Sequence, residues 1–433
     1  MIDKLIRNTI TIGFPALMLF IAILATGKTG DSATWSGLRK VGLSFGMLSG
    51  LGVLVFAGFV ANYFSYFVVD SLLVRFYQQR RELEQPEQLV IEIDRLPITN
   101  DLKIKLKWAV LHSSNHKLIS VKHAILKWFM IAAIVNALLS IAGYLGEFNL
   151  LFELNSHFKL QYLLVGFSTL IFFALVRSKK IWLLVSAFCI IMNLAEIVPW
   201  YLPAPAFAGS TPGQLLRILH SNVLTSNQRY ADVISLVKSE QPDIAVFVEV
   251  STAWAKELAV LSEMFPYSSQ QQESEEYGSA IYSKLPLENA AVKAFSQTRR
   301  SLSADVKFEG KTISMLLVHP SVPIKPQSFI DRNQQLAAIG EYAAQVKNPL
   351  VVVGDFNTTM WSPFYKNMVK TAGLRNARSG FGILPTWPTF MPLLYIPIDH
   401  LLVSKEIGVL KIHTGSNIGS DHLPLITDLV VGR

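Results

Sequence analysis

Five long apolar stretches in the first 200 residues constrain this chain most. They cover residues 10–25, 41–65, 124–146, 160–176 and 181–200. A helix that crosses a bilayer needs roughly 17 to 25 mostly apolar residues, and each stretch is long or apolar enough to do so. We therefore expect about five transmembrane helices, while a buried core helix is the alternative reading of each stretch.

The first stretch also resembles a signal peptide, because Lys4 and Arg7 precede it and it is short and contains Pro15. No small-x-small cleavage site stands out, and a second apolar stretch follows soon after. These features favour an uncleaved helix.

Basic residues in the connections predict the orientation of the helices. Residues 75–122 carry nine Lys and Arg and residues 177–180 carry three, whereas 146–159 carry only Lys159. Cytoplasmic connections are enriched in Lys and Arg, so the first two segments are expected inside. The chain is then a multi-pass protein of the cell inner membrane, with everything after residue 200 periplasmic or otherwise extracytoplasmic. Three basic residues at 28–40 leave the orientation of the first two helices open.

The charge distribution argues against a nucleic-acid footprint. Of the net +8, residues 1–213 carry +7 (19 basic, 12 acidic) and residues 214–433 carry +1 (20 basic, 19 acidic). The basic excess belongs to the apolar half, where it reads as membrane topology. Cys189 is the one cysteine, so no disulfide forms within the chain.

The expected domains follow from these shifts in composition. A charged segment with two prolines separates the second and third apolar stretches and reads as a small cytoplasmic helical insert. Pro199 at the end of the last stretch and Pro203, Pro205 and Pro212 after it indicate a linker. The limits we expect are 1–73 (two transmembrane helices), 74–122 (insert), 123–200 (three transmembrane helices), 201–214 (linker) and 215–433 (outer domain).

The outer domain alternates apolar strand patterns with helical ones. We expect helices at 228–239, 254–265, 328–346 and 363–371, and strands at 215–223, 244–250, 279–282, 301–309, 311–318, 398–403, 407–413 and 425–430, with a further strand that begins at Leu350. This order makes a two-sheet α/β sandwich plausible. Periodicity alone does not separate it from other α/β arrangements.

Polar residues end several of these strands. The clearest case is Leu-Val-Val-Val-Gly-Asp-Phe-Asn at 350–357, in which a buried strand ends in a carboxylate and an amide. Glu249 lies between apolar neighbours, where an unpaired charge costs several kcal/mol. The residues in such positions are Asn222, Glu249, His319, Asp355, Asn357, Asp399, Asp421 and His422.

Taken singly, these residues have ordinary readings. Asp355 fits a turn, Asn357 a helix cap and His319 a structural histidine. His400 points away from its neighbour Asp399 because strand side chains alternate, so a structural role is expected for it. Arg299 and Arg300 read as a solvated pair. Together, however, the carboxylate and amide oxygens are ligands that suit Mg²⁺ or Mn²⁺, as hydrolysis of a phosphate ester requires.

In these motifs the sequence resembles the endonuclease/exonuclease/phosphatase (DNase I-like) superfamily, and most closely its membrane-anchored bacterial members. The resemblance covers about 215–431 and depends on six ordered sites, including Gly-Asp-Phe-Asn at 354–357, Ile-Asp-His at 398–400 and Ser-Asp-His at 420–422. Val248 departs from the Gln that often precedes the metal-binding Glu. The resemblance implies a four-layer α/β sandwich with a metal-dependent phosphoesterase site.

The resemblance also implies roles for individual residues. Glu249 would be the principal metal ligand, with Asp421 and Asn222 completing or bordering the site. Asp355 would orient or deprotonate the attacking water, and Asn357 would hold this water or a phosphoryl oxygen.

The remaining implied roles concern the phosphate. His422 would contact the scissile phosphate, oriented by Asp399, and His319 would donate to the phosphate or the leaving group. Asn222 and Asn357 would border the bound substrate, and Tyr282 and Arg332 are further candidate substrate contacts.

We therefore expect a membrane-anchored, Mg²⁺- or Mn²⁺-dependent phosphodiesterase acting outside the cytoplasm on a lipid headgroup or a nucleic acid. The alternative is a non-catalytic binding domain on a membrane scaffold or transporter component. The aromatic, proline-rich stretch 387–397 either shapes a substrate pocket or lies on the bilayer, and the sequence does not decide between the two.

Overall fold

The computed structural model describes residues 73–431 except 75, 82, 113–114, 204–213, 273–276 and 297–298. The apolar stretches expected at 10–25 and 41–65, and most of the linker, lie outside the described residues. The chain divides into two compact units, Met1–Trp128 and Phe129–Arg433, and each is described by itself. The domain limits expected from the sequence stay a prediction.

The described part of the first unit is helical. Helices α4 (Pro86–Arg95) and α5 (Asn100–Leu111) follow a short helical segment that begins at Leu73. Arg80 forms ion pairs with Glu84 and Glu92, both at 2.6 Å. The apolar side chains of these helices form a small core of their own, comprising Tyr77, Leu89, Ile93, Leu102, Leu106 and Val110.

Among the described residues, three helices are long and apolar enough to cross a membrane, as the sequence predicts for residues 124–200. The elements involved are α6 (Asn115–Ala142) with η2 (Gly143–Leu145), then α7 (Leu150–Leu154), η3 (Asn155–Phe158) and α8 (Lys159–Leu175), then α9 (Lys180–Ile197) with η4 (Val198–Tyr201). The candidate spans are Ala124–Leu145, Leu150–Leu175 and Lys180–Tyr201. The second starts earlier than expected because α7 and η3 lead directly into α8.

Two mixed six-stranded sheets form the rest of the second unit. Sheet A has the order β11 (Ile407–Thr414), β12 (Leu425–Val431), β1 (Gln214–Asn222), β2 (Ile244–Val248), β4 (Gly278–Ser283) and β3 (Tyr267–Gln272). Sheet B has the order β5 (Leu287–Ala294), β6 (Arg300–Phe308), β7 (Lys311–Val318), β8 (Leu350–Asp355), β10 (Asp399–Val403) and β9 (Arg375–Asn376). Among the strand pairs that the structure describes, β1–β2 and β7–β8 are parallel and the others are antiparallel.

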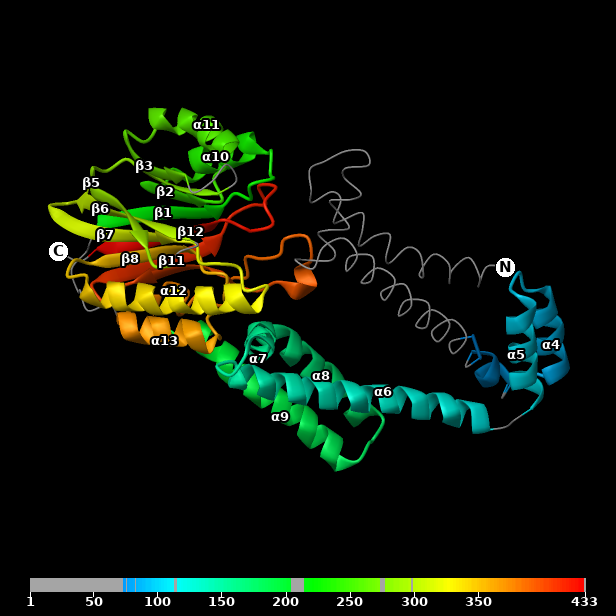
Figure 1. Cartoon of the computed structure of the whole chain (residues 1–433). Helices are drawn as coiled ribbons and strands as arrows, with labels where there is room; N and C mark the ends of the chain where they lie inside the picture. Colours follow the sequence, from blue (N-terminus) through cyan, green and yellow to red (C-terminus); the bar gives the residue numbers. More distant parts are fainter. Residues whose placement is uncertain are drawn as a thin grey trace. The chain divides into compact units, whose positions relative to one another are not determined.

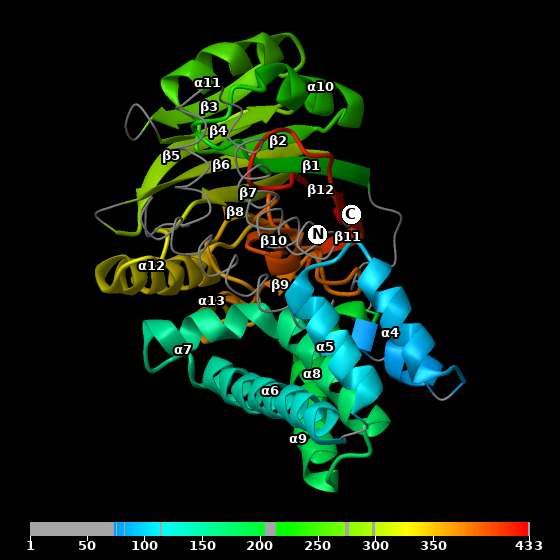
Figure 2. The ribbon, with the colours of Figure 1, turned by 90° about the vertical axis from the view of Figure 1, so that its right-hand side faces the viewer.

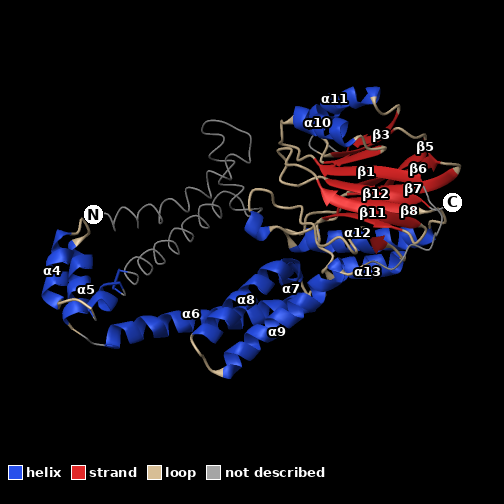
Figure 3. Ribbon diagram, turned by 180° about the vertical axis from the view of Figure 1, so that it is seen from behind, coloured by secondary structure: helices blue, strands red, loops and turns tan. Residues whose placement is uncertain are grey.

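Helices cover both outer faces of this sandwich. Helices α10 (Tyr230–Glu240) and α11 (Thr252–Leu258), the latter continued by η5 (Ala259–Glu263), lie over sheet A. Helices α12 (Pro326–Gln345) and α13 (Pro363–Ala372) lie over sheet B (Figures 1 and 2). Figure 3 shows the strands enclosed between helices. The four layers match the α/β sandwich expected from the sequence.

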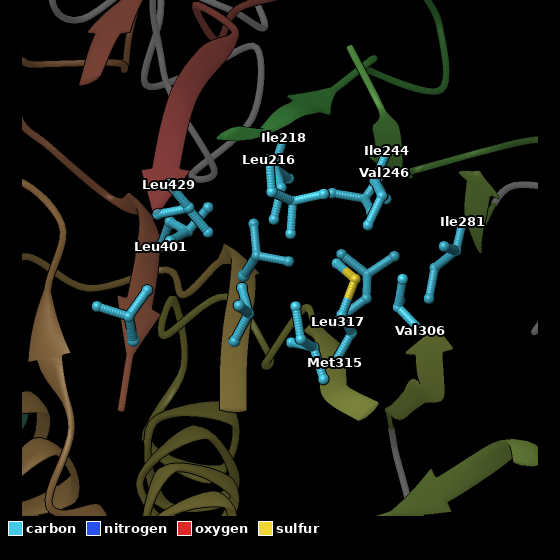
Figure 4. Close-up of a cluster of buried hydrophobic side chains, with 14 of the residues drawn as sticks. Leu216, Ile218, Ile244, Val246, Ile281, Val306, Met315, Leu317, Leu401 and Leu429 are labelled. Carbon is cyan, nitrogen blue, oxygen red and sulfur yellow. The ribbon is translucent and has the colours of Figure 1, made fainter. Parts of the chain in front are cut away.

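Residue alternation explains how the central strands are buried on both faces. In β8, Val351 and Val353 face the core between the sheets, whereas Leu350 and Val352 face α12 and α13. A strand covered on both faces needs apolar residues at every position, as the sequence has here. Side chains from both sheets interdigitate in the core between them (Figure 4).

Candidate active site

The pairing of the strands brings the polar strand ends to one edge of the sandwich. Asn222 pairs with Val248, so Glu249 follows directly beside it. Asp399 pairs with Asp355 across the β8–β10 ladder. Carboxyl ends of neighbouring parallel strands meet at one edge, and we call this edge, with the loops that leave it, the site edge.

Gly354 allows β8 to approach β7 at this edge. Its φ is +151°, and a Cβ there would lie 1.9 Å from the carbonyl oxygen of Val318. Only glycine tolerates this geometry. The glycine before Asp355 therefore sets the position of the carboxylate.

Asn222 lies at the centre of the polar cluster. Its amide nitrogen donates to Glu249 Oε1 at 2.9 Å and to Asp355 Oδ2 at 3.1 Å. Its amide oxygen accepts from the backbone of Leu224 at 3.0 Å. One buried amide thus holds two carboxylates from different sheets close to each other.

Asp399 lies between two imidazoles. Its Oδ2 is 2.8 Å from His422 Nδ1, and its Oδ1 is 2.9 Å from His220 Nε2. All three side chains are buried. A carboxylate that engages one ring nitrogen fixes the tautomer and the direction of the imidazole, so His422 is left with Nε2 facing Asp355 Oδ2 at 3.6 Å.

The charges in the cluster separate the pKa values of its members. Burial works against ionisation, but the charge and hydrogen bonds of His422 and His220 hold the pKa of Asp399 well below its usual range. Burial likewise opposes charge on His422, yet Asp399 and Asp355 raise its pKa well above its usual value. Burial raises the pKa of Asp355 to about 7. The site therefore combines a charged imidazole with a carboxyl group able to accept a proton.

Glu249, His319 and Asp355 present three ligand atoms within 4.8 Å of one another. His319 Nε2 lies 3.9 Å from Glu249 Oε1 and 3.7 Å from Asp355 Oδ2, and this buried nitrogen has no hydrogen-bond partner among the described residues. Burial, with the charges of Arg299 and His422, lowers the pKa of His319 well below its usual value. A neutral imidazole beside two carboxylates fits a bound divalent cation.

Asp355, Asp399 and His422 form a second such group. Both oxygens of Asp399 already accept hydrogen bonds from imidazoles. We therefore assign Asp399 to orienting His422 and His220 rather than to metal binding.

Asp421 differs in part from the expectation. Among the described residues it belongs to neither group of potential ligands, and its Oδ2 accepts from Trp387 Nε1 at 3.2 Å. Its charge nevertheless adds to the effect of burial in raising the pKa of Glu249. Asp421 thus lies close enough to Glu249 to act on it electrostatically.

Asn357 follows Asp355 in an unusual backbone conformation. Its φ is +51°, its backbone nitrogen donates to Asp355 Oδ1 at 2.9 Å, and its side-chain amide donates to the carbonyl of Pro320 at 3.0 Å. Glu249 also has a positive φ, of +60°. Such backbone conformations cluster at functional sites, and two occur here within one polar cluster.

Two expected substrate contacts lie elsewhere. Tyr282 is 2% exposed and packs against Phe247 and Phe265 beneath the helices that cover sheet A, because its position in β4 points to that face. Arg332 is fully buried and forms an ion pair with Glu153. In this structure neither side chain is available to a substrate.

Sequence reasoning missed several neighbours of the cluster. His220 was detectable, because it lies two residues before Asn222 on the same strand face. Arg299, interpreted as one of a solvated pair, is only partly exposed and lowers the pKa of His319. Trp387 begins the aromatic stretch noted in the sequence, but its contact with Asp421 could not be predicted, because this contact depends on how two loops meet.

His400 has the structural role expected from its alternation with Asp399. It is buried, with Nε2 2.9 Å from the carbonyl of Thr358. Its Nδ1 lies 3.0 Å from the amide nitrogen of Asn376 and 3.1 Å from Arg378 Nη1. Nδ1 accepts hydrogen bonds from these donors and Nε2 donates to the carbonyl. This is the hydrogen-bond pattern of a neutral imidazole.

Several solved structures are similar to this chain. Similar solved structures include D. rerio TDP2 complexed with a single-strand DNA product (15% identity, TM-score 0.44, 50% of this chain and 99% of that chain). Others are an endonuclease/exonuclease/phosphatase from Beutenbergia cavernae (19%, 0.42, 51% and 72%) and the human Nocturnin catalytic domain with bound sulfate (18%, 0.42, 50% and 94%). No curated protein matches the sequence.

The sequence of the outer domain also matches a protein family. The match spans residues 218–422, which include every polar residue of the cluster described above. The family whose model matches these residues is the Endonuclease/Exonuclease/phosphatase family.

Proposed function

We propose that this protein is a membrane-anchored, metal-dependent phosphoesterase whose active domain lies outside the cytoplasm. The observation that carries the proposal is the cluster in which Asn222 joins Glu249 and Asp355 beside the Asp399–His422 pair. Paired carboxylates and an oriented imidazole are what hydrolysis of a phosphate ester requires.

A divalent cation fits beside Glu249, with Asn222 and Asp421 at its border. Mg²⁺ or Mn²⁺ is the expected ion, because carboxylate oxygens are the ligands that these cations prefer. When bound, the cation supplies positive charge that neutralises the phosphoryl oxygens.

The chain's own residues carry the remaining steps. Asp355, buried and hydrogen-bonded through Oδ1 to the backbone of Asn357, orients the attacking water and accepts its proton. The amide of Asn357, anchored on Pro320, leaves its oxygen for this water. His422, charged and oriented by Asp399, holds a phosphoryl oxygen, and His319 donates to the phosphate or the leaving group.

The distribution of basic residues supports an extracytoplasmic active domain. The turn between α8 and α9 contains Arg177, Lys179 and Lys180, which favours a cytoplasmic position for that turn. The opposite ends of these helices then lie outside, and β1 follows the outer end of α9. A position in the cell inner membrane and a bacterial origin remain part of the proposal.

The test uses the full chain in detergent micelles, supplied with Mg²⁺ or Mn²⁺ and a panel of phosphate esters. The panel comprises bis(p-nitrophenyl) phosphate, oligonucleotides, sugar phosphates and phospholipid vesicles. We expect hydrolysis that a chelator abolishes and that Glu249→Ala removes without lowering the thermal midpoint of unfolding. Full activity in the chelator would refute metal dependence.

Salt dependence then separates the two substrate classes. Hydrolysis of a polyanionic nucleic acid should weaken steeply as salt increases, whereas hydrolysis of a lipid should depend on how the lipid is presented. A protein inert towards the whole panel would favour the non-catalytic binding domain.

A further inference from the structure

Three loops of the site edge contact the apolar helices. The loop after β8 meets α9, where Trp361 Nε1 donates to the carbonyl of Glu196 at 3.0 Å. It also meets α7 through Glu153 and η3 through His157. Gly380 and Gly382 donate their backbone N–H groups to the carbonyl of Trp200 at 3.0 and 2.9 Å. A third loop, residues 387–396, receives two hydrogen bonds from Gln161. The site edge thus lies next to the ends of the apolar helices.

The 387–396 loop joins the active site to α8. At one end, Trp387 and Thr389 contact Asp421, the former through its side chain and the latter through its backbone N–H at 2.9 Å. At the other end, Gln161 Nε2 donates to the carbonyls of Leu393 and Tyr395, both at 3.1 Å. Gln161 lies within the candidate span Leu150–Leu175.

An apolar tip projects from this loop beside the helix. The short helix η6 (Pro392–Leu394) carries Leu393, whose side chain is 82% exposed. Phe148 and Leu151, at the same end of the helices, are 77% and 70% exposed. Apolar side chains that continue the surface of a membrane-crossing helix are expected to enter the bilayer.

We propose that the substrate is a phosphate ester in the headgroup of a lipid of the same bilayer, reached from the membrane surface beside the 387–396 loop. This inference rests on the proposed phosphoesterase function. Residues 214–433 carry 20 basic and 19 acidic residues, so the domain lacks the positive excess with which proteins hold nucleic acids. The apolar tip inserts into the bilayer. The 387–396 loop connects this tip to Asp421 in the active site.

The test compares two substrates on the full chain. One is a phospholipid panel (phosphatidylglycerol, phosphatidylethanolamine, cardiolipin and sphingomyelin, each in phosphatidylcholine vesicles), and the other is soluble bis(p-nitrophenyl) phosphate. We expect headgroup release from at least one lipid. Leu393→Asp should lower the ratio of vesicle to soluble-ester hydrolysis by about 10-fold, because one charge at the membrane surface opposes insertion.

Leu410→Asp is the matched control. Leu410 is 62% exposed on β11, an edge strand of sheet A, and contributes to none of the loop contacts described above. The Leu410→Asp variant should keep the wild-type ratio of vesicle to soluble-ester hydrolysis. Hydrolysis of the soluble ester or of oligonucleotides without lipid hydrolysis would overturn the lipid inference alone, as would equal ratios for the two variants. Inertness towards every ester would instead refute the proposed function.

A separate observation concerns a buried ion pair between α7 and α12, which lies beside the loop after β8; we call this loop the catalytic loop. Glu153 of α7 and Arg332 of α12 are both fully buried, with Arg332 Nη2 2.9 Å from Glu153 Oε1. Arg332 Nη1 donates to the carbonyl of Asn357 at 2.8 Å. The guanidinium therefore links a helix outside the two-sheet sandwich to the residue next but one to Asp355.

Further contacts join Glu153 to the same loop. Its Oε1 accepts from Ser362 at 2.8 Å and from Thr358 at 3.3 Å. Its Oε2 lies 3.2 Å from His157 Nε2, and His157 Nδ1 lies 3.0 Å from the hydroxyl of Thr359. The loop that follows Asp355 is thus held from one side by two residues of the helical segment.

From these contacts we infer that Glu153 is a positioning residue for catalysis, acting through Arg332 on the loop that carries Asp355 and Asn357. A buried charge left without its partner is strongly unfavourable, so the loop conformation depends on the pair. Displacing a catalytic group by about 1 Å costs up to about 100-fold in rate. The helical segment would therefore complete the active site as well as anchor it.

Two variants of the full chain test this role with bis(p-nitrophenyl) phosphate. Glu153→Gln should lower kcat by about 10- to 100-fold with little change in KM. Glu153→Asp keeps the charge and should recover part of this loss. Thermal unfolding of each variant establishes that it is folded.

Glu196→Gln is the control from the same interface. Glu196 pairs with Lys366 of α13 at 2.9 Å, and no hydrogen bond or ion pair joins its side chain to the catalytic loop among the described residues. Its kcat should stay at the wild-type value. A folded Glu153→Gln protein whose kcat matches that of Glu196→Gln would reduce the pair to a structural contact and overturn the inference.

Discussion

Asp399 shows how single contacts determine the chemistry of this site. A carboxylate without exposed surface would ordinarily take up a proton, because burial penalises its charge. His220 and His422 each contact one of its oxygens and keep it ionised. The same contacts direct Nε2 of His422 towards Asp355, so the orientation of His422 and the ionised state of Asp399 have the same cause.

Asp399→Asn should therefore lower kcat by about 100-fold or more while leaving KM nearly unchanged, because the amide neither stabilises the imidazolium nor fixes its tautomer. Steady-state kinetics with a phosphate ester hydrolysed by the wild type would measure this. Asp428→Asn is the control: Asp428 is also buried, pairs with Arg217 and lies on β12. It should lose stability but keep kcat, and an equal loss of kcat in both variants would contradict the assignment.

His400 makes the fold sensitive to acid. Burial and the charge of Arg378 lower the pKa of His400 to about 3, from an ordinary value of 6.5. Between these values the unfolded chain binds the proton and the folded chain does not, so stability falls as the pH decreases below about 6.5.

His400→Gln should remove this sensitivity. The variant should show a shallower decrease of the unfolding midpoint between about pH 7 and 5, because the wild type loses up to about 1.4 kcal/mol per pH unit from this group. Thermal unfolding at a series of pH values measures the slope. A variant with the wild-type slope would assign the acid sensitivity to other groups.

Among the elements, β8 was the most predictable. Its apolar residues point alternately to the two cores, so the strand is visible in the sequence and begins at Leu350 as expected, although it runs through Gly354 to Asp355. The hairpin of β6 and β7 was equally clear, because Gly310 marks the turn with a φ of +76°.

Edge strands β3, β5 and β9 were not predicted. Strand β3 is polar (Tyr-Ser-Ser-Gln-Gln-Gln), β5 is largely exposed, and β9 has two residues. A strand at the edge of a sheet is not covered by apolar layers on both faces, so its sequence shows little apolar periodicity. Their pairing is determined by the neighbouring strands.

Gly354→Ala should be far more damaging than Gly310→Ala. The new Cβ at 354 would lie 1.9 Å from Val318 O, whereas at 310 nothing lies within 4 Å. We expect the first variant to lose several kcal/mol of stability and its activity, and the second to lose about 1 kcal/mol through its positive φ alone. Thermal unfolding and kinetics of the pair measure this, and similar losses would contradict the close approach of β7 and β8.

At the scale of the whole second unit, the helices and the sandwich share a core. Leu163 and Ile190 of α8 and α9 belong to the same buried cluster as Leu336 of α12 and Trp361 of the catalytic loop. Burying an apolar side chain of this size contributes about 1.5–3 kcal/mol. The two-sheet sandwich therefore depends on the helices for part of its stability.

A chain beginning at Gln214 should accordingly unfold at a lower temperature than one beginning at Ala124, and should have a lower kcat on a soluble ester. The loss follows from exposure of the shared cluster and from the unpaired Arg332. Calorimetry and kinetics of the two truncated chains compare them. Equal midpoints and equal kcat would mean that the helices only tether the domain.

Local sequence patterns were enough to predict the three apolar helices among the described residues, the alternation of strands and helices, and the strand ends that carry Asn222, Glu249, His319, Asp355 and Asp399. These features are local: apolar length, residue alternation and the polar residue that ends a buried strand are all readable along the chain. The order of six such sites was sufficient to indicate the family.

Only the tertiary structure decided which side chains meet. It placed His220 against Asp399, Trp387 against Asp421 and Glu153 against Arg332, and it buried Tyr282 under helices. These contacts join residues far apart in the chain, and they depend on strand register and loop packing, which no local pattern encodes. The sequence therefore identified the chemical groups of the site, and the fold determined their partners.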